Sequence, residues 1–199
     1  MRLVPGWALL SSGCAPVVLI AGWTIAALLE GPAYNPATQT ISVLAAYGAA
    51  GFWVMTGALA ALGACHVLTA WGLRPAALPG RVALGAGGVA ACVVALVPPP
   101  SSGGSLRHGS AAAVGFALLA VWPVLAADRQ GTAPWGLRPA PSFAATALMV
   151  FGAAWFMFEM HQGRAAGAVE RLVTAIQSVW PFVVVASCPR RPPPEDPSR

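Results

Sequence analysis

A stripe of polar side chains runs along the last long apolar segment of the chain. Glu170, Thr174 and Gln177 follow one another at helical spacing, and Arg171 stands beside the first of them. Residues three and four apart share one face of a helix. Polar groups that face lipid are costly, so this stripe should face the interior of a helix bundle or a wet cavity. Such a set could bind a polar headgroup.

More polar groups stand at the ends of other apolar segments, which we place on the same side of a membrane. Glu30 ends the first segment, His108 begins the fourth and Glu159 ends the fifth. A polar stretch between the first two segments adds further side chains. We predict an outward-opening pocket with apolar walls below it, lined by Glu30, Tyr34, Gln39, Ser42, His108, Glu159, Glu170, Arg171, Thr174 and Gln177.

Three functional hypotheses follow from this pattern. The leading one is a protein without enzymatic activity that binds a small amphipathic or lipid-like molecule in the pocket. The second is a membrane enzyme acting on a lipid or envelope precursor, with His108 and a carboxylate as its acid–base pair. The third is a structural or assembly subunit. It would pack through stripes of small residues in the second and third segments: Gly57, Ala61, Cys65 and Thr69, and Ala83, Gly87, Ala91 and Ala95.

Against all three stands a plainer interpretation, in which these groups only hydrate and cross-link helix ends at the membrane surface. No stretch has the spacing of a zinc site, a nucleophile elbow or a phosphate loop, so the sequence assigns no reaction, no metal and no cofactor. The four cysteines, Cys14, Cys65, Cys92 and Cys188, stand singly in apolar runs and are typical of packing residues.

The composition predicts the elements that position these residues. Hydrophobic residues make up 57% of the 199 residues and charged residues only 9%, far below the roughly 25% of soluble domains. A bilayer is the solvent that fits such a chain. We predict an all-α bundle in one domain, residues 1–188, with membrane spans at about 7–29, 52–71, 81–97, 108–126, 141–160 and 171–188.

The polar stretch after the first span predicts a short amphipathic helix. Asn35 is a suitable N-cap, Pro36 suits the first helical position, and the helix could run to Tyr47. It would lie on the outer surface of the bundle. At the other end of the chain, residues 189–199 are rich in Arg and Pro and are expected to form a disordered cytoplasmic tail.

The arginines predict the orientation. With the N-terminus inside, eight of the eleven basic residues fall on the inner side and three on the outer side. Positive residues favour the cytoplasmic side, so both termini should lie in the cytoplasm and the protein in the plasma membrane. The arginines are scattered singly at span ends, so the net charge of +5 indicates a lipid bilayer as partner and no nucleic acid. The oligomeric state stays open.

Two other features bear on depth and repetition. His66 is the one imidazole deep in a span, and we expect a hydrogen bond from it to a neighbouring helix. No second histidine lies at its depth, which argues against a bis-histidine haem. The hexapeptide Trp-Gly-Leu-Arg-Pro-Ala occurs twice, at 71–76 and 135–140, each time after an even-numbered span. Both interfacial anchoring and an ancient duplication explain it.

Several short motifs together resemble a known family. They are Tyr34-Asn35-Pro36, Thr40-Ile41-Ser42-Val43-Leu44, Trp53-Val54-Met55-Thr56, Arg107-His108 and Glu170-Arg171. In these motifs the chain resembles bacterial membrane proteins classed as domain of unknown function 998, from the first span to the sixth. Many members carry an acidic residue where this chain has Val43. The resemblance implies six membrane helices with shared polar residues at their outer ends, and no particular activity.

Overall fold

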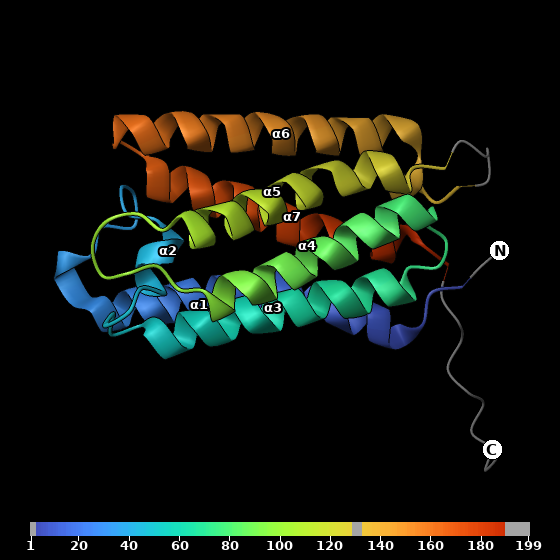
Figure 1. Ribbon diagram of the computed structural model, residues 1–199. Coiled ribbons are helices and arrows are strands. Elements are labelled where there is room, and N and C mark those ends of the chain that lie inside the picture. The colour runs from blue at the N-terminus through green and yellow to red at the C-terminus, as the bar shows by residue number, and fades with distance from the viewer. Residues whose placement is uncertain (1–2, 129–132, 190–199) are drawn as a thin grey trace, which may run out of the picture.

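The computed structural model describes residues 3–128 and 133–189. This part of the chain folds into α-helices and two short 3₁₀ turns, without strands (Figure 1). The helices are α1 (Gly6–Glu30), α2 (Ile41–Leu44), α3 (Phe52–Gly72), α4 (Leu78–Leu96), α5 (Leu106–Ala126), α6 (Pro139–Gln162) and α7 (Ala166–Ser187), and the turns are η1 (Gly31–Ala33) and η2 (Trp135–Leu137).

All helices except α2 are long and apolar enough to cross a bilayer, so the predicted all-α bundle with six spans is confirmed. Their bounds differ from the predicted ones mostly at the ends. The last helix begins at Ala166, one turn earlier than predicted, which places Glu170 and Arg171 inside it rather than at its start. The predicted cytoplasmic tail lies outside the described residues except for Pro189.

The six long helices form a closed ring. Each packs against the next one in the chain, and α7 packs against α1. Across the ring α7 meets α3 and α5 at only a few places. Short loops join α3 to α4 (73–77) and α6 to α7 (163–165), and consecutive helices joined by a short loop pack side by side. The ring therefore encloses a space that side chains from several helices must fill.

Small residues bring the helices of the first half of the ring close together. A Cβ on Gly63 would lie 2.5 Å from the carbonyl oxygen of Gly88, and a Cβ on Gly80 would lie 2.3 Å from the backbone of Ala126. In the predicted stripe of α4, Gly87 packs against Leu119. In that of α3, by contrast, Gly57 has no neighbour within 4 Å of where its Cβ would stand. The close approach of α3 to α4 uses a different face, that of Gly63.

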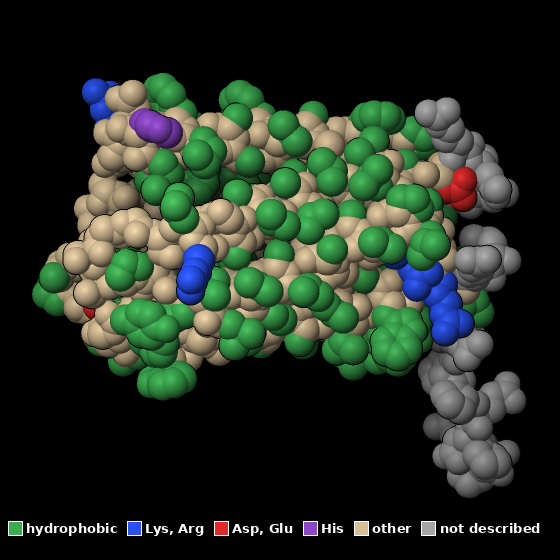
Figure 2. All heavy atoms as spheres, viewed as in Figure 1, with side chains coloured by type: hydrophobic (Ala, Val, Ile, Leu, Met, Phe, Trp, Pro, Cys, Tyr) green, Lys and Arg blue, Asp and Glu red, His purple; other side chains and the backbone are tan. Residues whose placement is uncertain are grey.

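The bundle has two distinct ends (Figure 1). One carries α2, and we call it the α2 end. The other carries the segments 73–77 and 133–138, and we call it the connector end. The amide of Val4 donates to the carbonyl of Pro189 over 3.1 Å, so both ends of the described chain meet at the connector end. On the face seen in Figure 2, hydrophobic and uncharged side chains occupy the middle of the bundle.

The two copies of the repeated hexapeptide take up similar positions at the connector end. Trp71 and Trp135 are more than half exposed, whereas Leu73 and Leu137 are buried in one hydrophobic cluster. Exposed tryptophans beside buried leucines are typical of anchors at a membrane surface. The first copy packs Gly72 on α1 and the second packs Gly136 on α7.

The helix after the first span is much shorter than predicted. It covers only Ile41–Leu44, and its N-cap residue is Thr40 rather than Asn35. The carbonyl oxygen of the Asn35 side chain accepts a hydrogen bond from Ala37 N over 2.9 Å, and its backbone amide donates to the side chain of Gln39 over 2.6 Å. These bonds hold residues 35–39 in a turn, because Asn readily bonds the backbone two residues on.

Candidate functional site

The segment from Tyr34 to Leu44, which we call the cover segment, lies across the α2 end and is bound by α7. One carboxylate oxygen of Glu170 accepts a hydrogen bond from the amide of Ile41 over 2.5 Å. Glu170 is only 6% exposed. This bond satisfies the first amide of α2, a group that a helix cannot satisfy internally. Glu170 therefore joins two segments that lie 129 residues apart.

Arg171 binds the same segment through its carbonyl groups. Its Nη1 donates to Pro36 O over 2.8 Å and to Gln39 O over 3.1 Å, and its Nη2 donates to the hydroxyl of Tyr34. The guanidinium also lies 5.9 Å from the ring centre of Trp23, within cation–π range. Arginine suits this place, since it offers several donors in a fixed plane.

The backbone at the start of α7 comes unusually close to the cover segment. A Cβ on Gly167 would lie 2.1 Å from Gln39 O and 2.5 Å from Pro36 O, so only glycine fits. The next amide, that of Ala168, donates to Ala37 O over 2.9 Å. Main-chain and side-chain bonds of α7 together hold the cover segment in place.

Tyr34 is buried at the centre of these contacts. Its hydroxyl donates to the carbonyls of Gln39 and Thr40, each over 3.1 Å. Burial raises the pKa of Tyr34, although the hydrogen bond from Arg171 opposes the shift. The phenol therefore keeps its proton at neutral pH and remains a donor.

His108 fastens the other side of the cover segment to α5. Its Nδ1 lies 3.0 Å from Val97 O, and its Nε2 lies 2.9 Å from the hydroxyl of Ser42. A carbonyl oxygen can only accept, so Nδ1 carries a proton, and we take the tautomer with that proton alone. Nε2 is then an acceptor, and the hydroxyl of Ser42 must donate to it. Both ring nitrogens are thus occupied without a carboxylate, and the predicted pairing of His108 with an acid is wrong.

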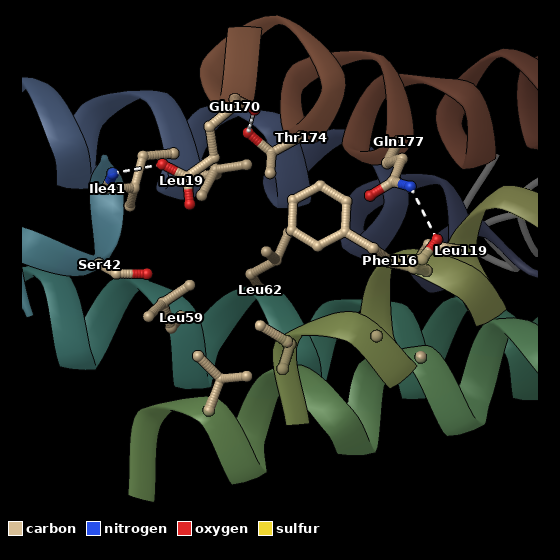
Figure 3. Close-up of a pocket in the computed structure, with 15 residues that line it drawn as sticks. Leu19, Ile41, Ser42, Leu59, Leu62, Phe116, Leu119, Glu170, Thr174 and Gln177 are labelled. Atoms are coloured by element: carbon tan, nitrogen blue, oxygen red, sulfur yellow. Dashed lines mark hydrogen bonds between the residues drawn. The ribbon is translucent and has the colours of Figure 1, made fainter. Parts of the chain in front are cut away.

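A cavity of about 80 Å³ lies beneath the cover segment, within the ring (Figure 3). A water molecule needs only about 10–15 Å³ by this measure. The wall is almost entirely apolar, and its polar members are Ser42, Glu170, Thr174 and Gln177. The remaining lining residues are Leu19, Ile41, Leu59, Leu62, Gly87, Ala91, Val94, Ala112, Gly115, Phe116 and Leu119.

The polar stripe of α7 faces this cavity. Thr174 bonds the carbonyl of Glu170 over 2.8 Å, one helical turn back. Gln177, 2% exposed, donates from Nε2 to the carbonyl of Phe116 over 3.0 Å. In Figure 3 the second oxygen of Glu170 points into the cavity, away from Ile41. The stripe thus carries its polar groups from the cover segment toward the middle of the bundle.

Two of the predicted pocket residues lie elsewhere. Glu30 accepts a hydrogen bond from the amide of Gly51 over 2.9 Å and so ties the end of α1 to the start of α3. Glu159 accepts from the amide of Ala165 over 3.0 Å and from the indole of Trp155 over 3.2 Å, closing the turn between α6 and α7. Neither lines the cavity, to which α6 contributes no residue.

The other predicted residues divide between two tasks. Tyr34, Gln39, His108 and Arg171 hold the cover segment, and Gln39 does so mainly through its backbone carbonyl. Thr174 and Gln177 line the cavity, while Ser42 and Glu170 do both.

The sequence did not indicate Gly115 or Phe116, which line the cavity from α5 together with Ala112 and Leu119. Their only signal was an apolar run shared with every other span. Trp23, which lies beneath the guanidinium of Arg171, was missed for the same reason.

His66 differs from its expected role. It is fully buried, and neither ring nitrogen has a hydrogen-bond partner within the described residues. The predicted bond to a neighbouring helix is therefore absent from this part of the chain. The described residues also contain no group of three His, Cys, Asp or Glu side chains that could hold a metal ion.

Comparison with known proteins agrees with the fold. A family model described as "Protein of unknown function (DUF998)" matches residues 14–187. No curated protein and no solved structure matches the chain. The match runs from α1 to the end of α7 and includes the cover segment and every residue that lines the cavity.

Proposed function

The chain belongs to the DUF998 family, whose function is unknown, and we propose that it is a multi-pass membrane protein that binds a small amphipathic or lipid-like molecule in the cavity under the cover segment. The observation that carries this proposal is the cavity itself, with its apolar wall and a few polar groups that begin at the cover segment and continue along α7. Apolar pockets with a few convergent polar groups are the usual form of small-molecule sites. The apolar part of the ligand would occupy the ring interior and its polar part would lie beside Glu170.

The burial of Glu170 supports this proposal. A carboxyl group that is 6% exposed costs free energy unless its partners compensate for the lost water. Its one bond to Ile41 occupies a single oxygen. A ligand that met the other oxygen would recover part of that cost.

We further propose that the protein lies in the plasma membrane with both termini in the cytoplasm. Three arginines of the described chain, Arg107, Arg164 and Arg171, belong to the α2 end or the helix turns next to it. Of the other eight, Arg74, Arg81 and Arg138 belong to the connector end or the helix turn next to it, and the remaining five precede α1 or follow α5 or α7 in the sequence. By the positive-inside rule, the connector end then faces the cytoplasm, and the α2 end with its cavity faces outward.

The test is to fill the cavity. Ala112→Leu places an isobutyl group among the lining residues, whereas Ala113→Leu adds the same group on the exposed face of the same helix. The wild type and the two variants are purified in mild detergent, and their bound molecules are identified by native mass spectrometry. We expect the wild type and Ala113→Leu to retain the same small amphiphile, and Ala112→Leu to lose it. Equal retention by all three proteins would overturn the proposal.

A further inference from the structure

We propose that the ligand of this cavity carries a protonated primary amine, so that the site selects cationic amphiphiles over neutral ones and rejects anionic ones. This inference rests on the proposed binding function and specifies its chemistry. It follows from the hydrogen bonds that the polar lining residues already make. Apart from one amide hydrogen of Gln177, the side-chain hydrogens of the polar lining residues are donated within the protein, and the remaining polar atoms are acceptors.

Ser42 donates its only hydroxyl hydrogen to His108. The carbonyl of Val97 places a proton of the imidazole on Nδ1, and in the tautomer with that proton alone Nε2 receives the hydrogen of Ser42. The hydroxyl oxygen keeps a lone pair, and Ser42 lines the cavity. Toward a ligand, this serine is an acceptor.

Thr174 is committed in the same way, and Gln177 donates one of its two amide hydrogens. The hydroxyl of Thr174 can only donate to the carbonyls of Glu170 and Arg171, over 2.8 and 3.2 Å. The amide nitrogen of Gln177 must face the carbonyl of Phe116, since an amide oxygen there would meet another acceptor. Its oxygen then lies on the side of the Phe116 ring (Figure 3).

In the proposed complex, Glu170 supplies the charge that pairs with the ammonium group. One of its oxygens receives the amide hydrogen of Ile41, and the other points into the cavity with lone pairs to offer. An ammonium group there would form a charge-assisted hydrogen bond and leave a neutral pair, which is cheaper to bury than a single charge. A carboxylate or phosphate head would meet acceptors and a like charge instead.

The basic residue next to Glu170 in the chain directs its hydrogen-bond donors to the cover segment and to its own helix. Arg171 directs its guanidinium to the carbonyls of Pro36, Gln39 and Gly167 and to the hydroxyl of Tyr34. It is not among the lining residues of the cavity. The described lining therefore presents one acidic side chain and no basic one.

The test compares three ligands of equal chain length: hexylamine, hexan-1-ol and hexanoic acid. Their dissociation constants are measured by titration calorimetry on the purified full-length protein at neutral pH. We expect hexylamine to bind at least about tenfold more tightly than hexan-1-ol, because one charge-assisted bond replaces a neutral one. Hexanoic acid should bind more weakly than the alcohol.

A matched pair of variants assigns the preference to one carboxylate. Glu170→Gln keeps an oxygen to accept from Ile41 but turns an NH₂ group toward the cavity. Glu159→Gln makes the same change in an acid that does not line the cavity. We expect Glu170→Gln to lose the preference for the amine, so that its dissociation constants for hexylamine and hexan-1-ol become similar. Glu159→Gln should behave as the wild type.

The outcomes separate the two levels of the proposal. If all three ligands bind alike and Ala112→Leu abolishes their binding, the cavity binds amphiphiles but the inference about the amine is wrong. The same holds if hexanoic acid binds most tightly, or if Glu170→Gln retains the amine preference. If none of the three binds, the proposed function itself fails. If Glu170→Gln does not fold, the ligand series on the wild type and Glu159→Gln still decides the order of affinity.

Discussion

The two ends of the bundle are built on different principles. At the connector end, large apolar side chains such as Trp122, Leu73, Leu137 and Val184 fill one cluster and are less than 2% exposed. At the α2 end, a polar segment is held by hydrogen bonds over a cavity. Closely packed interiors resist change, whereas a hollow covered by hydrogen-bonded backbone can open at lower cost. We infer that the connector end stabilises the bundle and that the α2 end serves binding.

Arginine shows the same contrast on a smaller scale. At the connector end, Arg81 donates to the carbonyls of Ala70 and Trp71, the last turn of the preceding helix, over 2.9 and 3.0 Å. That is a local cap on a helix C-terminus. At the α2 end, Arg171 reaches Pro36 and Gln39, more than 130 residues away. The first bond stabilises a turn, and the second positions a cover.

The largest effect on stability should come from emptying the connector end. Trp122→Ala removes the largest fully buried side chain of the described chain and should lower the free energy of unfolding by about 3–5 kcal/mol. Denaturation by SDS in mixed micelles measures this change. The folded fraction should still bind hexylamine with wild-type affinity. A parallel loss of binding would show that the two ends are not independent.

A second variant disturbs the cover segment through Gly167, a residue that does not itself line the cavity. Gly167→Ala places a methyl group against the carbonyls of Pro36 and Gln39 and should cost about 1–3 kcal/mol, as overpacking does. Hydrogen exchange should rise in residues 34–44 and stay unchanged at the connector end. Gly109→Ala is the control, because no atom lies within 4 Å of its new Cβ. Unchanged exchange in the cover segment would contradict the contacts described here.

Removing one hydroxyl should have a smaller effect. Tyr34→Phe deletes the hydrogen bonds to Gln39 and Thr40 and leaves Arg171 short of a partner, so we expect a loss of about 1 kcal/mol in unfolding free energy. Tyr47→Phe removes the hydroxyl of an exposed ring and should stay within about 0.5 kcal/mol of the wild type. Equal effects of the two substitutions would argue against a specific role of Tyr34.

The smallest effect on stability should accompany the largest effect on binding. Ala112→Leu fills space that is already hollow, so its unfolding free energy should stay within about 1 kcal/mol of the wild type. Thermal denaturation without ligand measures this. Added hexylamine should raise the melting temperature of the wild type but not that of Ala112→Leu. A large destabilisation of Ala112→Leu would mean that the cavity is smaller than described.

The sequence predicted the spans well because one physical signal, the length of an apolar run, decides them. It predicted the polar stripe of α7 because helical spacing alone puts Glu170, Thr174 and Gln177 on one face. It failed for Glu30 and Glu159, since both carboxylates bind backbone amides. Every residue but proline has a backbone amide, so the residue types in a sequence do not indicate which amide a carboxylate will bind.

The same limit explains the errors around α2. Asn35 followed by Pro36 suits a helix start and a turn equally well, and the choice here depends on carbonyls that α7 draws to itself. The donors that bind these carbonyls, Ala168 and Arg171, lie more than 130 residues away in the chain. The sequence predicted the cavity only through its polar residues. Its apolar wall consists of the same residue types as the lipid-facing surface, so the sequence does not distinguish the two.

Photo-crosslinking tests the central claim most directly. A short alkylamine carrying a diazirine on its chain is bound to the purified protein, irradiated, and located by peptide mass spectrometry. The account predicts adducts on the lining residues of α4 and α5, at 87–94 and 112–119, which excess hexylamine removes and Ala112→Leu prevents. Adducts spread over the lipid-facing helix surfaces, unaffected by competitor or by Ala112→Leu, would contradict it.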